Sequence, residues 1–324
     1  MKPSIFISGL VPPKTYEMLA KQYDVTMYDK ESLITKKGML EGLAGKEALL
    51  CLLSNSVDKE IIERNPQLKI IANYGAGFNN IDMQTATALA IPVTNTPAVS
   101  TNATADLAMG LILAIARRIV EGDNTSRHGQ FTGWAPLYHL GVDVTNKALG
   151  IIGMGHIGRA VAKRAKAFDM KIIYYSRTRL QPEIETELNA TFMEFEDVIK
   201  SSDFLSLHAS YSPALHHMLG SKELSSMKPS AFLINTARGA MIDEVALLKA
   251  LKENRLAGAA LDVYEFEPQI TKGLEALKNV ILCPHLGNAT IETREAMGEI
   301  AANNIISVLS GKQAIHCVNR EIYK

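Results

Sequence analysis

Three polar side chains that each follow an apolar, strand-like run could perform chemistry together. Arg238 comes after L-I-N-T-A, Glu267 comes after L-D-V-Y-E-F, and His285 comes after L-C-P. Ligands of parallel α/β sheets bind beyond the carboxyl ends of the strands, so reactive groups are expected at these positions. An arginine can hold a carboxylate through two parallel hydrogen bonds, and a carboxylate beside a histidine favours the cationic, proton-donating imidazole. Such a trio could reduce a 2-keto acid, given a hydride donor.

Each of these residues also has an ordinary structural interpretation. An arginine after a strand is often part of a surface ion pair, a glutamate can cap a turn, and a histidine can be a buried structural residue. Cys283, two residues before His285, is interpreted as a packed thiol rather than a nucleophile. A cofactor site in the same chain would favour the catalytic interpretation of the trio.

The segment from Lys147 to Arg179 predicts such a site. An apolar strand (Ala148 to Ile152) leads through Gly153, Gly155 and Gly158 into a helix, and a second apolar strand ends at Ser176. In this layout the first glycine permits a tight turn, the second lets backbone N–H groups approach a pyrophosphate, and the third lets helix and strand pack closely. All four parts lie in order within one unit of about thirty residues, as a dinucleotide-binding site requires.

The end of the second strand indicates which dinucleotide binds. An NAD site places an Asp or Glu on the ribose hydroxyls there, whereas this chain has Ser176, Arg177, Thr178 and Arg179. Two guanidiniums and two hydroxyls suit a 2'-phosphate, so we expect NADPH to be preferred, with NADH as a second cofactor. The alternative is a solvated basic turn, because arginine is common on surfaces.

The length and charge of the chain favour a two-domain enzyme that acts on small molecules. A chain of 324 residues exceeds the ~250 to 300 residues at which single cores stop growing. Thirty-four basic residues balance thirty-four acidic ones, so the chain has no net positive charge that would attract nucleic acid or an anionic membrane. The N-terminal apolar run is too short for a signal peptide, and the three cysteines form no spacing pattern. A cytoplasmic protein is expected.

Short apolar runs alternate with helical patterns along most of the chain, which predicts parallel sheets covered by helices. In the first part we expect strands at 5–7, 25–27, 48–53, 69–72 and 92–94, with helices at 13–21, 36–42, 58–64 and 83–90. In the second part we expect six strands, at 148–152, 171–175, 204–207, 231–235, 257–261 and 280–282. The fold class is therefore α/β with two doubly wound parallel-sheet domains, one Rossmann-type and one flavodoxin-like.

Two long helices and one irregular segment set the expected domain boundaries. A helix over 102–122 would lead into the second domain, and a helix over 291–309 comes too late for its sheet and would return to the first. We expect a discontinuous substrate-binding domain (1–99 and 292–324) and a Rossmann domain (100–291) that binds NAD(P). The irregular segment 122–146 contains the single tryptophan, Trp134, and is predicted to be the arm of a homodimer.

Four ordered motifs identify a known family. G-M-G-H-I-G, N-T-A-R-G, L-D-V-Y-E-F-E-P and C-P-H-L-G-N-A-T resemble the D-isomer-specific 2-hydroxyacid dehydrogenases, closest to the glyoxylate/hydroxypyruvate reductase branch. The resemblance covers the whole chain, including T-A-D-L-A-M-G-L-I-L-A-I-A-R-R and N-Y-G-A-G-F-N-N-I-D. It implies that Arg238 orients the substrate, that His285 donates the proton to the carbonyl oxygen, and that Glu267 pairs with His285. Closure of the domains would exclude water around the hydride.

The resemblance also implies the remaining site residues. Asp262 would hydrogen-bond the nicotinamide carboxamide, with Thr236 and Ala237 near the same ring. The backbone N–H groups of Tyr74, Gly75, Ala76 and Gly77 would hold the substrate carboxylate together with Arg238 and His285. The expected cofactor contacts are Thr104, Gly153, Gly155, His156, Ile157, Gly158, Ser176, Arg177, Thr178, Arg179, His208, Thr236, Ala237, Arg238, Asp262, His285 and Gly287.

Two departures from the family pattern bear on these expectations. His208 is followed by A-S where the family often has L-H-x-P, while S-R-T-R and G-W-A-P are similar to the NADPH-preferring reductases. A D-lactate dehydrogenase using NADH or both cofactors remains an alternative, as does a nucleotide-sensing scaffold or corepressor, which would need no proton donor. Side-chain sizes at Tyr74, Phe78, Trp134 and Arg294 do not specify a substrate. No metal is expected, because His216 and His217 lack a carboxylate or cysteine at ligand spacing.

Overall fold

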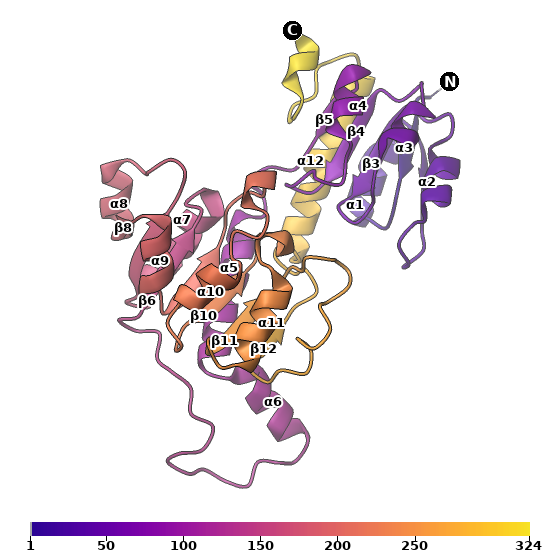
Figure 1. Cartoon of the computed structure of the whole chain (residues 1–324). Coiled ribbons are helices and arrows are strands. Elements are labelled where there is room, and N and C mark those ends of the chain that lie inside the picture. The colour runs from indigo at the N-terminus through magenta and orange to yellow at the C-terminus, as the bar shows by residue number, and fades with distance from the viewer. Residues whose placement is uncertain (1) are drawn as a thin grey trace. The chain divides into compact units, whose positions relative to one another are not determined.

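A computed structural model describes residues 2–324 and divides them into two compact units. The first unit contains Met1–Ser100 and Thr290–Lys324, and the second contains Thr101–Ala289. Figure 1 shows the elements of both units along the chain. Each unit is a parallel sheet with helices on both faces, so the predicted fold class is confirmed. No helix of the described chain is both long and apolar enough to cross a bilayer.

The first unit has a five-stranded sheet in the order β2-β1-β3-β4-β5. This is the flavodoxin-like order, with its strand-order reversal beside β1 and β3. The strands are β1 Ser4–Ile7, β2 Asp24–Met27, β3 Ala48–Leu52, β4 Ile70–Tyr74 and β5 Val93–Thr94. The helices are α1 Pro13–Ala20, α2 Lys36–Leu43, α3 Lys59–Glu63, α4 Met83–Ala88 and α12 Ile291–Leu309, followed by the 3-10 turn η3 Arg320–Tyr323.

Helix α12 belongs to the first unit by its packing. It lies against β4 and α1, as can be followed in Figure 1. A Cβ added at Gly298 would lie 1.8 Å from the hydroxyl oxygen of Thr15 in α1, so the two helices approach closely there. Met297, Ala301 and Ile305 fill the core that α12 shares with the sheet. A helix close to the C-terminus therefore completes a sheet built from the first hundred residues.

The second unit has a seven-stranded sheet in the order β12-β11-β10-β9-β6-β7-β8. Its strands are β6 Ala148–Ile152, β7 Lys171–Tyr175, β8 Ala190–Phe192, β9 Phe204–Leu207, β10 Phe232–Asn235, β11 Gly258–Leu261 and β12 Val280–Leu282. The helices are α5 Thr101–Ala116, α6 Ile119–Arg127, α7 His156–Lys166, α8 Pro182–Leu188, α9 Phe195–Ser201, α10 Ser221–Ser226 and α11 Glu244–Lys252, with 3-10 turns η1 Pro213–Leu215 and η2 Gly239–Met241.

Neighbouring residues of each strand point to opposite faces of this sheet. Leu149 and Ile151 of β6 join the core formed with α5, α7 and α8, whereas Ile152 joins the core formed with α9, α10 and α11. Both faces are thus buried, which explains the continuous apolar runs of the sequence. The prediction of six strands was wrong by one, because β8 is a three-residue edge strand that shows no period of its own.

The predicted single helix over 102–122 is two helices. Helix α5 ends at Ala116, and Arg118 adopts a left-handed backbone conformation with φ of 54° before α6 begins. The Arg118 side chain donates to both carboxylate oxygens of Glu121, at 2.9 and 2.8 Å, and to the carbonyl of Leu140 at 3.2 Å. The buried face of α5 stops at Ala116, and the following Ile119 and Val120 are exposed, so packing no longer favours a straight continuation.

The segment predicted to be irregular begins with helix, because α6 extends to Arg127. Beyond it, residues 128–147 contain no helix or strand. Apolar side chains of this stretch are exposed, with Trp134 and Leu137 each 84% accessible. Exposed contiguous apolar residues mark interaction surfaces, and the dimer arm stays a prediction.

Candidate active site

His285 and Glu267 form a hydrogen-bonded pair after adjacent strands. Nδ1 of His285 lies 2.9 Å from Oε2 of Glu267, and the two side chains are 34% and 37% exposed. They follow β12 and β11, which pair in parallel, so their carboxyl ends lie side by side. With Glu267 ionised, Nδ1–H is the donor, and Nε2 of the imidazole is left for a ligand.

The Glu267 carboxylate is held in its ionised form. Burial raises its pKa, but the hydrogen bond and positive charge of His285 outweigh burial, with help from Tyr264 N–H and Arg238, so the pKa lies below its ordinary value. The backbone N–H of Tyr264 donates to Oε1 at 3.0 Å, which orients the second carboxylate oxygen toward His285. The pair therefore has a fixed geometry as well as a fixed charge on the glutamate.

Arg238 lies in the turn after β10, next to the same segment. Its Nη1 donates to the carbonyl of Ala237 at 2.7 Å. Burial lowers the pKa of the guanidinium while nearby Glu267 raises it. Arginine is so basic that it is effectively always protonated in proteins. A Cβ at Gly239 would lie 1.8 Å from the carbonyl carbon of Tyr264, so the turn is in backbone contact with the segment that leads to Glu267.

Asp262 anchors the loop that carries His285. Its buried carboxylate accepts hydrogen bonds from the N–H groups of Leu286 at 2.6 Å and Gly287 at 2.8 Å, and its carbonyl accepts from His285 N at 3.0 Å. His285 itself has φ of 56°, a conformation uncommon for a residue with a side chain. Burial raises the pKa of Asp262 although both N–H groups favour its ionised form. Each carboxylate oxygen thus accepts one hydrogen bond within the protein and has a second acceptor position.

Two residues that position the site were not singled out from the sequence. The Tyr264 hydroxyl donates to the carbonyl of Cys283 at 2.8 Å, which links the segments after β11 and β12, and burial raises the pKa of this phenol. Asn235, fully buried at the end of β10, accepts from Ala237 N and donates to the Arg238 carbonyl, both at 3.0 Å. The signal that could have found Asn235 is a polar residue closing an apolar strand.

Cys283 behaves as the packed thiol that the sequence suggested. It lies partly buried beside Asp262, and burial together with this carboxylate raises the pKa of the thiol. A raised pKa lowers the thiolate fraction at neutral pH, which disfavours nucleophilic chemistry.

The three glycines of the dinucleotide motif differ in their surroundings. Gly153 has φ of 98°, and a Cβ there would lie 2.4 Å from Ala209 N. A Cβ at Gly158 would lie 2.2 Å from the carbonyl oxygen of Gly153, so strand and helix touch at this point. A Cβ at Gly155 would meet nothing within 4 Å, which leaves open space beside the N-terminus of α7. The first N–H groups of a helix, here from His156 onward, are unpaired within it and suit a pyrophosphate.

The fold makes the two arginines after β7 unequal. Arg179 forms a two-pronged ion pair with Glu185, with Nε to Oε1 at 2.8 Å and Nη2 to Oε2 at 2.9 Å, and its guanidinium lies 5.4 Å from the Phe192 ring centroid. Arg177 is exposed and has no side-chain partner in residues 2–324. Arg179 is therefore engaged by Glu185, and Arg177 is the more available of the two guanidiniums for a ligand.

A second hydrogen bond reinforces the Arg179 ion pair. The Tyr174 hydroxyl donates to Oε1 of Glu185 at 2.6 Å and accepts from Leu180 N at 2.9 Å. Hydrogen bonds from Arg179 and then Tyr174 lower the pKa of Glu185 to about 2. This network fixes the turn from Ser176 to Leu180.

His208 is the buried polar residue after β9. Its Nε2 lies 2.8 Å from the Ser206 hydroxyl, and its Nδ1 lies 3.5 Å from the Thr236 hydroxyl. Burial lowers the pKa of His208 to about 4, so the imidazole is neutral at pH 7. Thr104 of α5 donates to the carbonyl of Gly287 at 2.8 Å, on the loop of His285. Thr104, Thr236 and Gly287 are therefore structurally tied to the strand ends.

The predicted carboxylate-binding loop lies in the first unit, directly after β4. Gly75 N–H is used internally, donating to the Asn73 carbonyl at 3.0 Å, whereas the N–H groups of Ala76 and Gly77 have no partner within residues 2–324. Tyr74 is buried, its hydroxyl donates to the Arg294 carbonyl, and burial raises its pKa to about 12. Of the expected donors, those of Ala76 and Gly77 are therefore available for a ligand, and the roles of Tyr74 and Gly75 stay predictions.

A dinucleotide-type glycine turn beside an arginine and a paired histidine and glutamate defines a nucleotide-dependent oxidoreductase. The NAD binding domain of D-isomer specific 2-hydroxyacid dehydrogenases matches residues 109–287. A Staphylococcus epidermidis protein, provisionally assigned as a 2-hydroxyacid dehydrogenase, is 50% identical over 315 residues, covering 97% of this chain and 99% of its own. The chain belongs to the D-isomer-specific 2-hydroxyacid dehydrogenase family, as the motifs predicted, and is an oxidoreductase.

Solved structures agree with this assignment. A protein from Thermus thermophilus superposes with a TM-score of 0.92 at 38% identity, covering 97% of this chain and 99% of its own. An NADPH-dependent glyoxylate/hydroxypyruvate reductase from Sinorhizobium meliloti, solved with NADP and malonate, has a TM-score of 0.86 at 29% identity, covering 98% and 97%. The glyoxylate/hydroxypyruvate reductases are therefore among the structural neighbours of this chain.

Proposed function

We propose that this dehydrogenase reduces a small 2-keto acid, such as glyoxylate or hydroxypyruvate, to the D-2-hydroxy acid with NADPH as the preferred cofactor. The observation that carries the proposal is the His285–Glu267 pair, 2.9 Å apart, next to the Arg238 turn. A proton donor, its charged partner and a carboxylate-binding cation are the groups that reduction of a keto acid requires.

In the reduction direction His285 supplies the proton. Glu267 accepts from Nδ1 and stabilises the imidazolium, so Nε2–H is the group that faces the carbonyl oxygen. Arg238 binds the substrate carboxylate and stabilises the negative charge that develops on the carbonyl oxygen. A nicotinamide bound at the glycine turn would supply the hydride. The free N–H groups of Ala76 and Gly77 are proposed as further donors to the substrate carboxylate.

The cofactor would be held by the glycine turn and the turn after β7. The open space at Gly155 and the N-terminus of α7 suit the pyrophosphate, and Asp262 would orient the carboxamide. Arg177, exposed and unpaired in residues 2–324, supports a 2'-phosphate contact, as do the hydroxyls of Ser176 and Thr178. The S. meliloti reductase, described as NADPH-dependent, is consistent with this preference.

A substrate and cofactor panel tests the proposal. Glyoxylate, hydroxypyruvate and pyruvate would each be assayed with NADPH and NADH by the loss of absorbance at ~340 nm, the reduced-nicotinamide band. We expect the highest kcat/KM with NADPH and one of the first two acids, and chiral chromatography should show the D-isomer where the product is chiral. Pyruvate with NADH as the best pair would indicate a D-lactate dehydrogenase. No turnover with any pair would favour a nucleotide-sensing scaffold.

We also propose that two chains associate through the segment after α6. Its exposed Trp134 and Leu137 would be buried by a partner, as apolar surface of this kind requires. Light scattering should give twice the chain mass of 35.4 kDa, and replacing both residues by serine should shift the mass toward the monomer. A monomeric mass for the unaltered protein would refute the proposal.

A further inference from the structure

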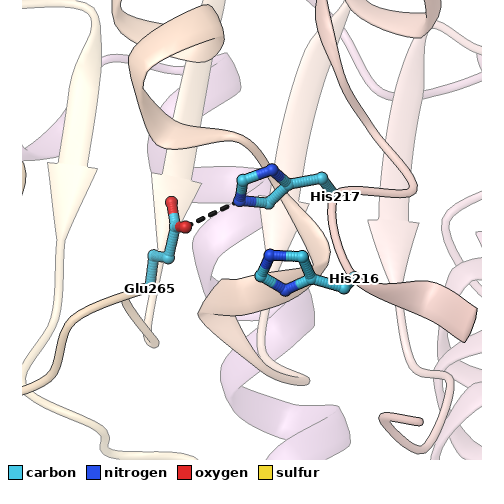
Figure 2. A group of neighbouring side chains, drawn as sticks. All are labelled: His216, His217 and Glu265. Carbon is cyan, nitrogen blue, oxygen red and sulfur yellow. Dashed lines mark hydrogen bonds and ion pairs between the residues drawn. The ribbon is translucent and has the colours of Figure 1, made fainter. Parts of the chain in front are cut away.

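The fold brings a carboxylate to the histidine pair that follows η1. Figure 2 shows Glu265, from the segment after β11, pointing toward His217. The ring of His216 is stacked against the ring of His217. Nε2 of His217 lies 2.6 Å from Oε1 of Glu265, and the two imidazole centroids are 4.0 Å apart with planes 18° from parallel. One ligand atom from each of the three residues lies within 4.8 Å of the others. No carboxylate was expected near His216 and His217 from the sequence. The structure shows that this expectation was wrong, because Glu265 lies beside His217.

Two buried carboxyl groups lie side by side in this cluster without a lysine or arginine partner in residues 2–324. The Glu265 side chain is only 9% exposed, and Glu244 behind it is 1% exposed. Glu265 N donates to Oε1 of Glu244 at 2.8 Å, Glu244 N donates to Oε2 of Glu265 at 3.5 Å, and the Thr271 hydroxyl donates to Oε2 of Glu244 at 2.5 Å. Within residues 2–324 neither carboxyl group forms an ion pair with a lysine or arginine, and the His217 imidazole is the one basic side chain that contacts Glu265. Buried carboxylates are stable when paired or bound to a metal, so a further cation would complete the cluster.

The donor set specifies the kind of cation. Two imidazole nitrogens with one carboxylate oxygen suit Zn²⁺ and related transition metals, whereas Mg²⁺ and Ca²⁺ prefer oxygen ligands alone. Metal–ligand bonds of about 2.0 to 2.2 Å place neighbouring ligands of a tetrahedral ion about 3.3 Å apart. The observed spacings of 2.6 Å and up to 4.8 Å bracket that value.

The side chains have the freedom to reach this geometry. The nitrogen lone pairs of the stacked rings lie in nearly parallel planes with ring centroids 4.0 Å apart, so one ring must turn for both nitrogens to face a single ion. His216 is exposed, and besides stacking on His217 its side chain has one long hydrogen bond, 3.5 Å from Nδ1 to the Tyr211 hydroxyl. Rotation of His216 would therefore break that long hydrogen bond and the ring stacking, while His217 and Glu265 would exchange their hydrogen bond for bonds to the metal.

We propose that His216, His217 and Glu265 form a binding site for one divalent cation of the zinc class, with water as the fourth ligand. The ion would neutralise the carboxylate pair and connect the segment after η1 to the segment that leads, two residues later, to Glu267. This inference is independent of the substrate and cofactor proposed above, because it rests on a separate set of side chains. It predicts metal binding whether or not the protein reduces keto acids.

Zinc competition on the full-length protein tests the site. After chelator treatment and desalting, Zn²⁺ is titrated against a chromophoric zinc indicator, and we expect one ion bound per chain that millimolar Mg²⁺ does not displace. His216→Ala and His217→Ala should each weaken zinc affinity by about 100-fold or more, since loss of groups that merely orient ligands already weakens binding about 10- to 100-fold. His128→Ala is the matched control, because His128 is exposed and contacts only the Asn124 carbonyl at 2.8 Å.

The outcomes separate this site from other zinc-binding groups. His285→Ala should leave zinc affinity unchanged, so a loss confined to that variant would place the ion at the His285–Glu267 pair and overturn the proposal. Unchanged affinity in both His216→Ala and His217→Ala, or no saturable binding to the unaltered protein, would also overturn it. His216 is exposed, so its variant should fold even if Glu265→Gln does not. Zinc-edge absorption spectroscopy should show two imidazoles and added oxygen ligands in the unaltered protein.

Discussion

Replacing Arg177 by alanine should weaken the use of NADPH and leave the use of NADH unchanged. The prediction rests on the unequal environments of the two arginines after β7. The Arg177 side chain is exposed and forms no hydrogen bond or ion pair within residues 2–324, so its removal leaves no protein group unpaired. Arg179 is held by both oxygens of Glu185. A loss specific to NADPH in Arg177→Ala would therefore report the contact to the 2'-phosphate and not a change in the fold.

The size of the loss follows from the kind of contact. A hydrogen bond to a charged group contributes about 1.5 to 3 kcal/mol, and each ~1.4 kcal/mol is a tenfold change. Solvent weakens exposed ion pairs, which places exposed Arg177 near the lower end of that range, at about tenfold in kcat/KM for NADPH. The change should appear mainly in KM, because the 2'-phosphate lies away from the reacting carbon and binds equally in ground and transition states.

The same assay on Arg179→Ala should give a different pattern. This substitution leaves the Glu185 side chain, which is 12% exposed, with the Tyr174 hydroxyl as its remaining partner. The turn from Ser176 onward would loosen, so both cofactors should lose affinity and the melting temperature should fall. Arg179→Lys should not restore the wild-type behaviour, because lysine lacks the two-pronged geometry.

Steady-state kinetics with both cofactors and thermal unfolding of each variant test whether Arg177 and Arg179 have these separate roles. Equal losses for NADPH and NADH in Arg177→Ala would show that Arg177 supports the turn and does not bind phosphate. A loss confined to NADPH in Arg179→Ala, with an unchanged melting temperature, would show that Arg179 leaves Glu185 when the cofactor binds. Either result would refute the division of roles inferred from the structure.

Three further predictions concern the proton donor, the ion pair and a backbone contact. His285→Ala should lower kcat for reduction by about 10² to 10⁴, the range for general acid catalysis, while cofactor affinity measured by fluorescence stays near wild type; near-normal turnover would contradict the assigned role. Because the folded pKa of Glu185, about 2, lies below the ordinary 4.5, its stabilisation is present above pH 4.5 and disappears as the pH falls toward 2. The gap in melting temperature between wild type and Glu185→Gln should therefore shrink below pH 4.5, and a gap independent of pH would exclude this cause. Gly239→Ala should lower the free energy of unfolding, measured in urea, by about 1 to 3 kcal/mol or more through overpacking, because the new Cβ would lie 1.8 Å from the Tyr264 backbone. Gly110→Ala is the control and should not lower it, because its Cβ would meet nothing within 4 Å. Equal effects of the two substitutions would contradict the close approach at Gly239.

The sequence predicted those parts of the fold that depend on local burial. Strands buried on both faces, such as β6 and β9, appear as short apolar runs because every residue faces one of two helix layers. The edge strand β8 was not predicted, because its three residues, one of them exposed, form no such apolar run. The end of α5 was missed for another reason: the left-handed Arg118 is stabilised by Glu121 and by the distant Leu140 carbonyl, which periodicity does not report.

The site shows the same division between local and long-range information. Positions after strands pointed to Arg238, Glu267 and His285, because the topology of a parallel sheet brings those ends to one edge. What the sequence could not supply are side-chain contacts that depend on how separate elements fold against each other. The engagement of Arg179 depends on Glu185 lying on the first helix after the turn, and the carboxylate beside His217 comes from 48 positions away.

These long-range contacts explain why three strand ends act as one structure. The Tyr264 segment touches the turn after β10 through the Gly239 backbone, and the Tyr264 hydroxyl holds the carbonyl of Cys283 two residues before His285. Asp262 binds the loop on the other side of His285. A change at any one of these points should therefore move the proton donor relative to Arg238 and lower kcat, even where the altered residue touches neither substrate nor cofactor. The geometry of the reaction is set by the backbone that joins β10, β11 and β12, and the three reactive side chains depend on it together.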